Sequence, residues 1–296
     1  PAMVTFLRRL RSSLKSCGSS YDTERPDAVL GMGGFTSIAP LFAARRRGIP
    51  AFLHESNAIP GKANRLAARF CRSVLLGFDD CARHFSKSST RVTGTPIRRE
   101  LAQGAPARAE ARLALGLEPE RTTLLVMGGS QGAAGINALM AQAASHLSAT
   151  ALQVVHLAGE HDAETVRSAY ATAGIPAVVL PFCDRMQEVY PAADLAISRS
   201  GAASLGELSW FGLPSVLVPF PYAAEDHQRL NAEIFTRAGA AKLLPEPEAT
   251  GQSLSRLVIS LLESPETLAT MATAARALAP RDAAARVAAV LTGVKS

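Results

Sequence analysis

Short apolar runs alternate along the chain with longer segments in which apolar residues recur every three to four positions. The short runs have the length of buried β-strands, and the longer segments have the period of helices that cover a sheet. The pattern predicts strands at 28–30, 51–54, 73–77, 122–127, 153–157, 177–181, 195–198 and 215–218. It predicts helices at 38–47, 62–71, 134–147, 163–173, 202–211 and 227–238.

This alternation predicts an α/β fold with parallel, doubly wound sheets. The polar stretch 103–120 interrupts the alternation, and we expect a domain boundary near 98–106. We predict two Rossmann-like domains, residues 1–100 and 101–279, with a cleft between them. A C-terminal helix at about 280–296 is expected to pack back on the first domain. Ligands of such sheets bind beyond the carboxyl ends of the strands.

Charge is distributed unevenly between the two halves of the chain. The net charge is +6, but residues 1–100 hold 17 Lys and Arg against 7 Asp and Glu, and the remainder holds 14 against 18. A basic first half suits phosphate groups or an acidic membrane surface, or it is simply a solvated surface. Basic segments interleaved with aromatic residues are missing, so nucleic acid is not expected as a partner.

Cysteine usage and hydropathy indicate the compartment. The four cysteines have no CxxC spacing and are expected to be free thiols in a reducing cytosol. No apolar run approaches the roughly 20 residues that span a bilayer. The sequence also contains no DxD pair and no cluster with metal-ligand spacing, so we expect neither a metal nor another cofactor.

A glycine-rich turn follows the predicted strand 122–127. The turn contains four glycines: Gly128, Gly129, Gly132 and Gly135. Glycines allow a tight turn and close approach to a ligand, and the helix that follows adds the positive end of its dipole. The turn, which also holds Ser130 and Gln131, therefore suits a diphosphate. The spacing GGxxGxxG and the lack of an acidic residue at the end of the next strand argue against a nicotinamide dinucleotide. A tight turn without a ligand is the alternative.

Two more turns follow strands in the second half. Ala202, Ala203 and Ser204 open a helix whose free N–H groups can hold phosphate, and Glu207 lies within that helix, where it can accept from a ribose diol. The alternative for Glu207 is an ordinary solvent-facing residue. After the next strand, the neutral polar groups of His227, Gln228 and Asn231 suit a hydroxyl-rich ligand such as a sugar. A surface helix capped by Asp226 is the alternative there.

The basic half contains two segments that follow neighbouring strands and are therefore expected at one sheet edge. The first is a glycine turn with Gly31, Gly33, Gly34 and Ser37. The second is His54-Glu55-Ser56-Asn57, in which His54 is a candidate general base or hydrogen-bond donor. A purely structural histidine is the alternative.

Taken in order, these segments resemble one family. They are PDAVLGMGGFTS (26–37), HESNAIPGKANRLAA (54–68), VTGTPIR (92–98), LLVMGGSQGAAGIN (124–137), the stretch 193–232 and AGAAKLL (238–244). Together they are similar to the MurG family, the UDP-N-acetylglucosamine (UDP-GlcNAc) transferases of peptidoglycan synthesis. The resemblance implies a two-domain GT-B fold. It also implies inverting, metal-independent transfer of GlcNAc to undecaprenyl-diphosphate-linked MurNAc-pentapeptide.

The resemblance also implies roles for individual residues. Ser130 and the adjoining Gln131 amide would face the donor diphosphate, with Arg98 and Asn57 contributing. The backbone at Phe182 and Cys183 would meet the uracil, and Cys183 stands where the family more often has an aliphatic residue. Ala202 to Ser204 would hold phosphate, Glu207 the ribose, and Gln228 with His227 the GlcNAc hydroxyls. The turn 31–37 would form the loop for the acceptor diphosphate.

The chain departs from the family pattern at three places in its first half. A GGTGGH-type loop does not precede Pro26, HESN replaces the commoner HEQN, and TSIAP replaces an SGP-type turn. We therefore expect an incomplete first domain, and His54 is the candidate base. The alternatives are a sugar-nucleotide-binding module with impaired turnover, and another GT-B enzyme or UDP-GlcNAc epimerase that uses the same donor.

The N-terminal segment fits a basic amphipathic helix. Phe6, Leu7, Leu10 and Leu14 can share one helix face, with basic residues around it: these are Arg8, Arg9, Arg11 and Lys15. Such a helix suits an anionic membrane surface, which predicts a peripheral protein on the cytoplasmic face of the inner membrane. A buried structural helix is the alternative.

Overall fold

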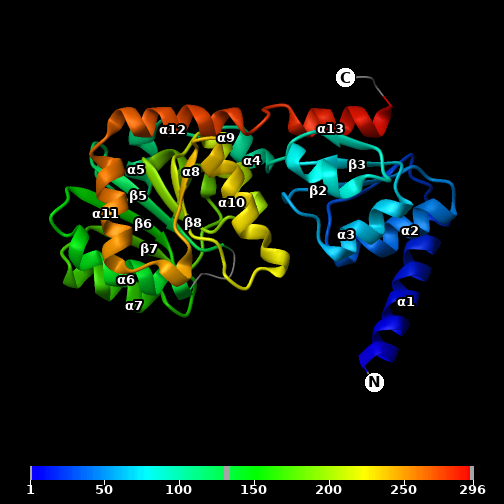
Figure 1. Cartoon of the computed structure of the whole chain (residues 1–296), viewed down its shortest axis with the longest axis horizontal. Coiled ribbons are helices and arrows are strands. Elements are labelled where there is room, and N and C mark those ends of the chain that lie inside the picture. The colour runs from blue at the N-terminus through cyan, green and yellow to red at the C-terminus, as the bar shows by residue number, and fades with distance from the viewer. Residues whose placement is uncertain (1, 130–133, 294–296) are drawn as a thin grey trace. The chain divides into compact units, whose positions relative to one another are not determined.

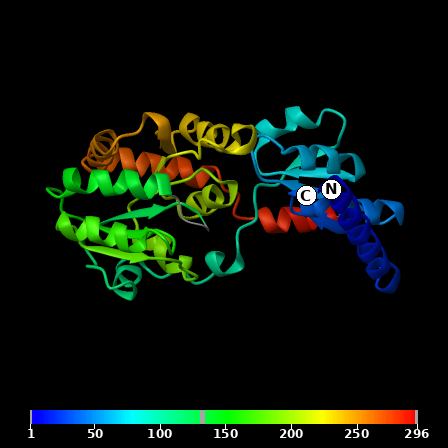
Figure 2. The ribbon, with the colours of Figure 1, turned by 90° about the horizontal axis from the view of Figure 1, so that it is seen from below.

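The computed structural model describes residues 2–129 and 134–293, and for residues 2–4, 6 and 7 it describes the backbone alone. The chain divides into two compact units (Figures 1 and 2). Unit 1 consists of Pro1–Pro96 and Pro280–Ser296, and unit 2 of Ile97–Ala279. Each is built on its own parallel sheet flanked by helices, as the predicted fold class requires.

Unit 1 contains a parallel sheet in the order β1-β2-β3-β4. Its strands are β1 (Val29–Gly31), β2 (Ala51–Glu55), β3 (Ser73–Leu76) and β4 (Thr90–Val92). Its helices are α1 (Ala2–Thr23), α2 (Ile38–Arg46), α3 (Lys62–Ala67) and α13 (Ala283–Thr292). Leu41 of α2 packs with Leu53 of β2 and Val74 of β3, and all three are fully buried. This apolar core holds the strand ends in register.

Helices α1 and α13 are the two terminal elements of unit 1. Asp22 near the end of α1 pairs with Arg47 at 2.7 Å, and the N-terminal part of α1 extends away from the sheet (Figure 1). Near the start of α13, Pro280 contacts Gly94, where an added Cβ would come within 2.8 Å of the proline ring. Gly94 also has φ +75°, so this contact with the C-terminal segment needs a glycine. None of the described helices is both long and apolar enough to cross a membrane.

Unit 2 contains a parallel sheet in the order β10-β9-β8-β5-β6-β7. Its strands are β5 (Thr122–Met127), β6 (Leu152–Leu157), β7 (Ala177–Leu180), β8 (Leu195–Ser198), β9 (Ser215–Leu217) and β10 (Ala241–Leu243). Its helices are α4 (Arg99–Ala102), α5 (Arg108–Ala114), α6 (Ala134–Leu147), α7 (Ala163–Thr172), α8 (Met186–Ala192), α9 (Ala202–Phe211), α10 (His227–Arg237), α11 (Gly251–Leu262) and α12 (Pro265–Ala277). This strand order is that of a complete Rossmann sheet.

Helices cover both faces of the unit 2 sheet. Leu124 and Val126 of β5 face one core, which Met140 of α6, Tyr170 of α7 and Val258 of α11 complete. Figure 1 shows α6 and α7 lying side by side below the strands. Helix α8 contacts β5 and α9. Because the strands are covered on both sides, they read as continuous apolar runs.

Each predicted strand is present in the described chain, with ends that agree within one residue. The prediction missed β4 and β10, which are three residues long and carry the exposed Arg91 and Lys242. It also missed α5, which lies inside the polar stretch 103–120, and the helices α8, α11 and α12. The predicted helix 62–71 ends as α3 and continues as a 3₁₀ turn, Ala68–Phe70.

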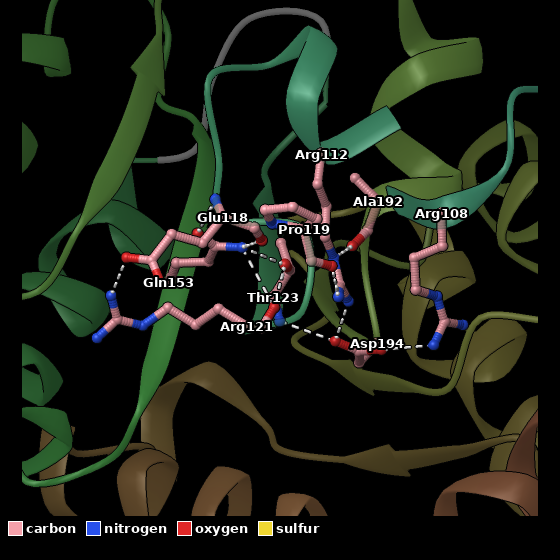
Figure 3. A network of polar contacts seen from close by, with 9 residues as sticks. All are labelled: Arg108, Arg112, Glu118, Pro119, Arg121, Thr123, Gln153, Ala192 and Asp194. Carbon is pink, nitrogen blue, oxygen red and sulfur yellow. Dashed lines mark hydrogen bonds and ion pairs between the residues drawn. The ribbon is translucent and has the colours of Figure 1, made fainter. Parts of the chain in front are cut away.

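A polar network at the amino ends of β5 and β8 joins α5 to the sheet (Figure 3). The guanidinium of Arg112, which is buried, donates to Asp194 Oδ2 at 2.6 Å, to Ala192 O and to Pro119 O. Asp194 also accepts from the Thr123 N–H at 2.8 Å and from the more exposed Arg108 at 2.8 Å. Loss of Asp194 would leave the buried Arg112 with an uncompensated charge.

Replacing Asp194 with alanine should therefore lower the free energy of unfolding by about 3–5 kcal/mol, since Arg112 would stay buried without a carboxylate. Trp210, the one tryptophan in the sequence, lies in unit 2 and provides a fluorescence signal for denaturant unfolding. Glu164→Ala, which breaks an exposed pair with Arg167, is the control and should change the stability much less. Equal midpoints for the two variants would contradict the role given to Asp194.

Candidate functional site

The strand order of unit 2 reverses direction between β5 and β8. These two strands are neighbours, with Met127 paired to Ser198 at their carboxyl ends. The chain leaves β5 toward β6 and leaves β8 toward β9, so the loops after β5 and β8 diverge. Open α/β sheets bind ligands at this switch point. The two turns that the sequence singles out, after 127 and after 198, both begin there.

The two residues after β5 and the first turns of α6 are the described parts of this segment. Gly129 has φ +99°, a conformation that favours glycine. Ser130 and Gln131, predicted to meet a diphosphate, lie outside the described residues. In the first turns of α6, Asn137 Nδ2 donates to Ala158 O at 2.8 Å and to Asp162 Oδ2 at 2.7 Å. Asp162, one of the acidic residues closest to the end of β6, is thus engaged in holding α6.

Asn137 connects α6 to a buried histidine. Its Oδ1 accepts from His156 Nε2 at 3.0 Å, and His156 Nδ1 accepts from the Tyr170 hydroxyl at 2.9 Å. Both bonds require a neutral imidazole, since Nδ1 must keep a lone pair. Burial of this fully enclosed ring lowers the pKa of His156 from 6.5 to about 3.

The turn after β8 is held by buried polar side chains. Arg199 donates to Val218 O at 3.0 Å and Pro219 O at 3.1 Å, and its guanidinium lies 5.4 Å from the Phe220 ring centre. Ser200 Oγ donates to Gln228 O at 2.7 Å. These contacts bind the loop after β8 to the loop after β9, so the start of α9 is fixed relative to the start of α10.

Helix α9 begins at the switch point with Ala202, Ala203 and Ser204. The first N–H groups of a helix have no acceptor within it, and they carry the positive end of the helix dipole. In the described part of the chain these three N–H groups have no hydrogen-bond acceptor. The arrangement suits an anion, as the sequence predicts.

The predicted polar cluster lies at the start of α10, but its members differ in whether their side chains are available to a ligand. Gln228 Oε1 accepts from the Phe220 N–H at 3.0 Å, and its amide nitrogen donates to no atom of the described residues. His227 donates to Ala224 O at 2.7 Å. Asn231, by contrast, is fully buried and donates to Ser200 O at 3.0 Å. The prediction that Asn231 meets sugar hydroxyls does not fit this geometry, because its amide supports the loop.

Asp226 does not cap α10, contrary to the alternative drawn from the sequence. It has φ +55° and accepts no capping hydrogen bond from a backbone N–H of the helix, and its carboxylate instead accepts from the Arg229 side chain of α10. Glu225 beside it has φ +52°. Two non-glycine residues in the left-handed region mark a strained turn next to Gln228.

Glu207 lies between two partners on other elements. Its Oε2 accepts from the Tyr190 hydroxyl of α8 at 2.6 Å, and its Oε1 lies 3.3 Å from Arg98 Nε and Nη2. The sequence pattern does not predict a role for Tyr190, because a tyrosine 17 positions before a candidate carboxylate is no signal in itself. Glu207 is therefore no free surface residue, and the structure brings it together with the predicted Arg98.

Cys183 lies in the segment between β7 and α8, next to Phe182. The Phe182 side chain is 68% exposed, and burial raises the pKa of the half-buried Cys183 thiol. This thiol is therefore protonated at neutral pH.

In unit 1, a buried carboxylate ties the two predicted loops together. Glu55 accepts from the N–H and the Nδ2 of Asn57, at 2.9 and 3.0 Å, and from Asn64 Nδ2 at 2.6 Å. Asn64 Oδ1 accepts from the Gly34 N–H at 3.0 Å. The loop after β1 is thus attached to the end of β2, as expected for neighbouring parallel strands. Asn64 is a residue that the sequence analysis did not single out.

The glycine turn after β1 is closely packed. At Gly33, which has φ +92°, an added Cβ would lie 2.9 Å from Asn64 Nδ2 and 3.2 Å from His54 O. At Gly31 it would lie 2.8 Å from a Leu41 methyl group. Ser37 Oγ donates to Gly33 O at 2.8 Å. The turn therefore requires glycine at both positions, and its serine hydroxyl holds the loop.

His54 occupies a structural position. It is fully buried, its Nε2 donates to Gly94 O at 2.9 Å, and its Nδ1 accepts from Ser56 Oγ at 3.1 Å. Burial lowers the pKa of His54. A general base needs a free nitrogen within reach of the substrate, and both nitrogens here are engaged inside unit 1. The geometry argues against the predicted catalytic role and favours the structural alternative.

Comparison with known proteins identifies the family. Residues 123–287 match the glycosyltransferase family 28 C-terminal domain, and residues 1–76 match the N-terminal domain of the same family. The chain is 40% identical over 285 residues to the UDP-N-acetylglucosamine--N-acetylmuramyl-(pentapeptide) pyrophosphoryl-undecaprenol N-acetylglucosamine transferase of a Nocardioides species. That match covers 96% of this chain and 77% of the relative. The chain belongs to the MurG family.

Other comparisons agree with this membership. A Geobacter transferase of the same name is 40% identical, over 90% of this chain and 71% of its own length. The crystal structure of MurG from Acinetobacter baumannii superimposes with a TM-score of 0.77 at 29% identity, covering 95% of this chain and 77% of that one. A UDP-GlcNAc 2-epimerase from Neisseria meningitidis, at 16% identity and a TM-score of 0.72, shares the fold. The predicted family and the GT-B fold are confirmed.

The buried His156 of this MurG family member predicts a specific pH dependence. Below pH 6.5 the unfolded chain binds a proton that the folded chain does not accept until about pH 3. The folded state therefore loses stability as the pH falls through this window, by about 2 kcal/mol between pH 6.5 and 5.

Denaturant unfolding followed by Trp210 fluorescence at several pH values measures this slope. His156→Gln keeps a donor for Asn137 and an acceptor for Tyr170, so its slope between pH 6.5 and 5 should be shallower by the same amount. Above pH 7 the free energy of unfolding should change with pH in the same way for the variant and the wild-type protein. Identical slopes below pH 6.5 would mean that His156 is protonated in the folded state.

Proposed function

We propose that this protein transfers GlcNAc from UDP-GlcNAc to the 4-hydroxyl group of undecaprenyl-diphosphate-linked MurNAc-pentapeptide, with inversion at the anomeric carbon. The observation that carries the proposal is the 40% identity, over 96% of the chain, to an enzyme whose name states this reaction. The geometry of unit 2 supports it, because the segments after β5, β8 and β9, which carry the candidate donor-site residues, follow neighbouring strands and lie at one sheet edge.

The donor half of the reaction belongs to unit 2. The N–H groups of Ala202, Ala203 and Ser204 hold a phosphate of UDP and stabilise the negative charge that develops as UDP leaves. Glu207 accepts from the ribose diol. Ser130 and Gln131 face the diphosphate from the turn after β5, and Cys183 lies against the uracil.

Two side chains complete the donor site. The free amide nitrogen of Gln228 donates to a GlcNAc hydroxyl, with His227 beside it. Arg98, whose side chain is 55% exposed, turns from Glu207 to the donor diphosphate when the nucleotide binds. A long, exposed ion pair costs little to break, and a diphosphate offers more negative charge than one carboxylate.

The acceptor half belongs to unit 1. Gly31, Gly33, Gly34 and Ser37 form the loop for the acceptor diphosphate, and Asn57 lies at the neighbouring strand end. The Glu55–Asn64–Gly34 chain of hydrogen bonds keeps that loop in place. In the reaction the acceptor oxygen bonds to the anomeric carbon, the bond to the UDP oxygen breaks, and the acceptor proton passes to a base.

A transfer assay with radiolabelled UDP-GlcNAc tests the reaction. Labelled disaccharide should form when a lipid-linked MurNAc-pentapeptide is added, and none should form without it. Isomerisation of UDP-GlcNAc in the absence of acceptor would instead favour an epimerase. UDP binding without any product would favour a binding module.

Glu207→Ala should raise the KM for UDP-GlcNAc about 10- to 100-fold, because a hydrogen bond from the ribose to a charged group is lost. Glu164→Ala, an exposed carboxylate on α7, is the control and should keep the wild-type KM. If the Glu207 variant bound UDP as tightly as the wild-type protein in calorimetry, the ribose assignment would be wrong.

We also propose that α1 places the protein on an anionic membrane surface at the cytoplasmic face of the inner membrane. Arg8, Arg9 and Arg11 are exposed on this helix, whereas Leu10 and Leu14 are half-buried. Reversing the three charges to glutamate should weaken binding to phosphatidylglycerol vesicles by about a hundredfold or more, since each basic residue near such a surface contributes about 1 kcal/mol.

The control for this experiment reverses three other exposed charges of unit 1, Arg72, Lys87 and Arg91. This variant has the same net charge as the α1 variant. It should bind vesicles almost as the wild-type protein does, and added salt should weaken wild-type binding. Equal weakening in both variants would assign the effect to net charge and not to α1.

A further inference from the structure

The hydrogen bond between Tyr190 and Glu207 joins two helices of unit 2. Tyr190 lies on α8 and Glu207 on α9, and the phenolic oxygen is 2.6 Å from Oε2. The Tyr190 side chain is 2% exposed. A short bond from a buried hydroxyl to a carboxylate is among the stronger hydrogen bonds in proteins, and it fixes the rotamer of the acceptor.

The buried ring of Tyr190 also has an aromatic stacking partner. It stacks on Phe211 with ring centres 5.1 Å apart and planes at 18°. The two rings also line a cavity of about 390 Å³, whose wall continues with Leu213 and Arg276. The hydrogen bond to Glu207 adds to this packing and fixes the position of the phenolic oxygen relative to α9.

Tyr190 is suited to donate at every pH at which the protein works. Burial and the neighbouring carboxylate raise the pKa of Tyr190 well above its ordinary value. The phenol therefore keeps its proton and donates a hydrogen bond to Glu207 Oε2. That oxygen always has Tyr190 as its partner.

The other oxygen of the carboxylate has a different neighbour. Oε1 lies 3.3 Å from two nitrogens of Arg98, and the Arg98 side chain is 55% exposed whereas that of Glu207 is 14% exposed. This contact is long and solvated, so an incoming donor group can replace it at little cost. The carboxylate thus has one fixed oxygen and one exchangeable oxygen.

We propose that Tyr190 is a positioning residue for donor binding: by holding Oε2 it presents Oε1 of Glu207 to the ribose diol of a UDP-sugar. The proposal rests on the proposed function, in which Glu207 binds the ribose. Tyr190 does not touch the reacting atoms and acts through Glu207. Without its hydroxyl, Glu207 can adopt other rotamers, and the diol loses a preorganised acceptor.

Tyr190→Phe removes the hydroxyl and keeps the ring that stacks on Phe211. Calorimetry should compare UDP with 2′,3′-dideoxy-UDP, which lacks the diol. We expect the wild-type protein to prefer UDP. The variant should lose about tenfold in UDP affinity and little in affinity for the dideoxy compound. In the transfer assay the KM for UDP-GlcNAc should rise by a similar factor while kcat stays close to the wild-type value.

Tyr170→Phe is the matched control, because it removes a buried hydroxyl from the same unit that contacts His156 and not Glu207. It should lower thermal stability and leave the preference for UDP over dideoxy-UDP unchanged. In the double variant Tyr190→Phe with Glu207→Gln, the loss of UDP affinity should be smaller than the product of the two single losses.

Two results would overturn the proposal, and they are distinguishable. If Tyr190→Phe kept the wild-type preference for UDP while Glu207→Ala lost it, the ribose assignment would stand and Tyr190 would be a packing residue. If the wild-type protein bound UDP and dideoxy-UDP equally, the ribose role of Glu207 would itself fail, and the positioning role of Tyr190 with it.

Discussion

The carboxylate of Asp194 lies where β5 and β8 begin, and it accepts from a backbone N–H of one strand and from two arginines of α5. A charge of this kind stabilises only if each buried partner is satisfied, which the carbonyls around Arg112 ensure. The pair thereby joins α5 to neighbouring strands at the amino end of the sheet. The same two strands carry the predicted ligand loops at their carboxyl ends, so these loops depend on strands that this charge pair helps to hold together.

The two ends of the unit 2 sheet use polar residues in different ways. At the amino end, the groups around Asp194 satisfy one another. At the carboxyl end, Arg199, Ser200 and Asn231 satisfy loop carbonyls and leave the first N–H groups of α9 for a ligand. Buried carbonyls need donors, which these side chains supply, whereas the first N–H groups of α9 have no acceptor within the helix. The position of a predicted site residue therefore matters more than its type. The Gln228 amide nitrogen donates to none of the described residues, whereas that of Asn231, one turn later, donates to Ser200 O.

Much of this arrangement could be predicted from the sequence, because buried parallel strands are continuous apolar runs and their carboxyl ends share one edge. The turns after 127, 198 and 218 each follow a predicted strand of one parallel sheet, which is enough to expect them at the same edge. The short edge strands β4 and β10 gave no such signal, since three residues with a charged member resemble loop. The side-chain partners also lay beyond prediction. Position at a strand end placed His54 near the edge, but its burial depends on Gly94 and Ser56, and the partnership of Tyr190 with Glu207 depends on the packing of α8 against α9.

Two carboxylates illustrate how partner geometry separates a structural role from the binding role proposed for Glu207. Glu55 is 1% exposed, with Oε1 shared by two donors of Asn57 and Oε2 held by Asn64, so each oxygen serves the loop itself. Glu207 has one oxygen held by a buried phenol and the other beside an exposed guanidinium. A residue that binds and releases substrate needs an orientation fixed from behind and an exchangeable partner in front. Only the second carboxylate meets both conditions, although both lie close to predicted ligand loops and share the same chemistry.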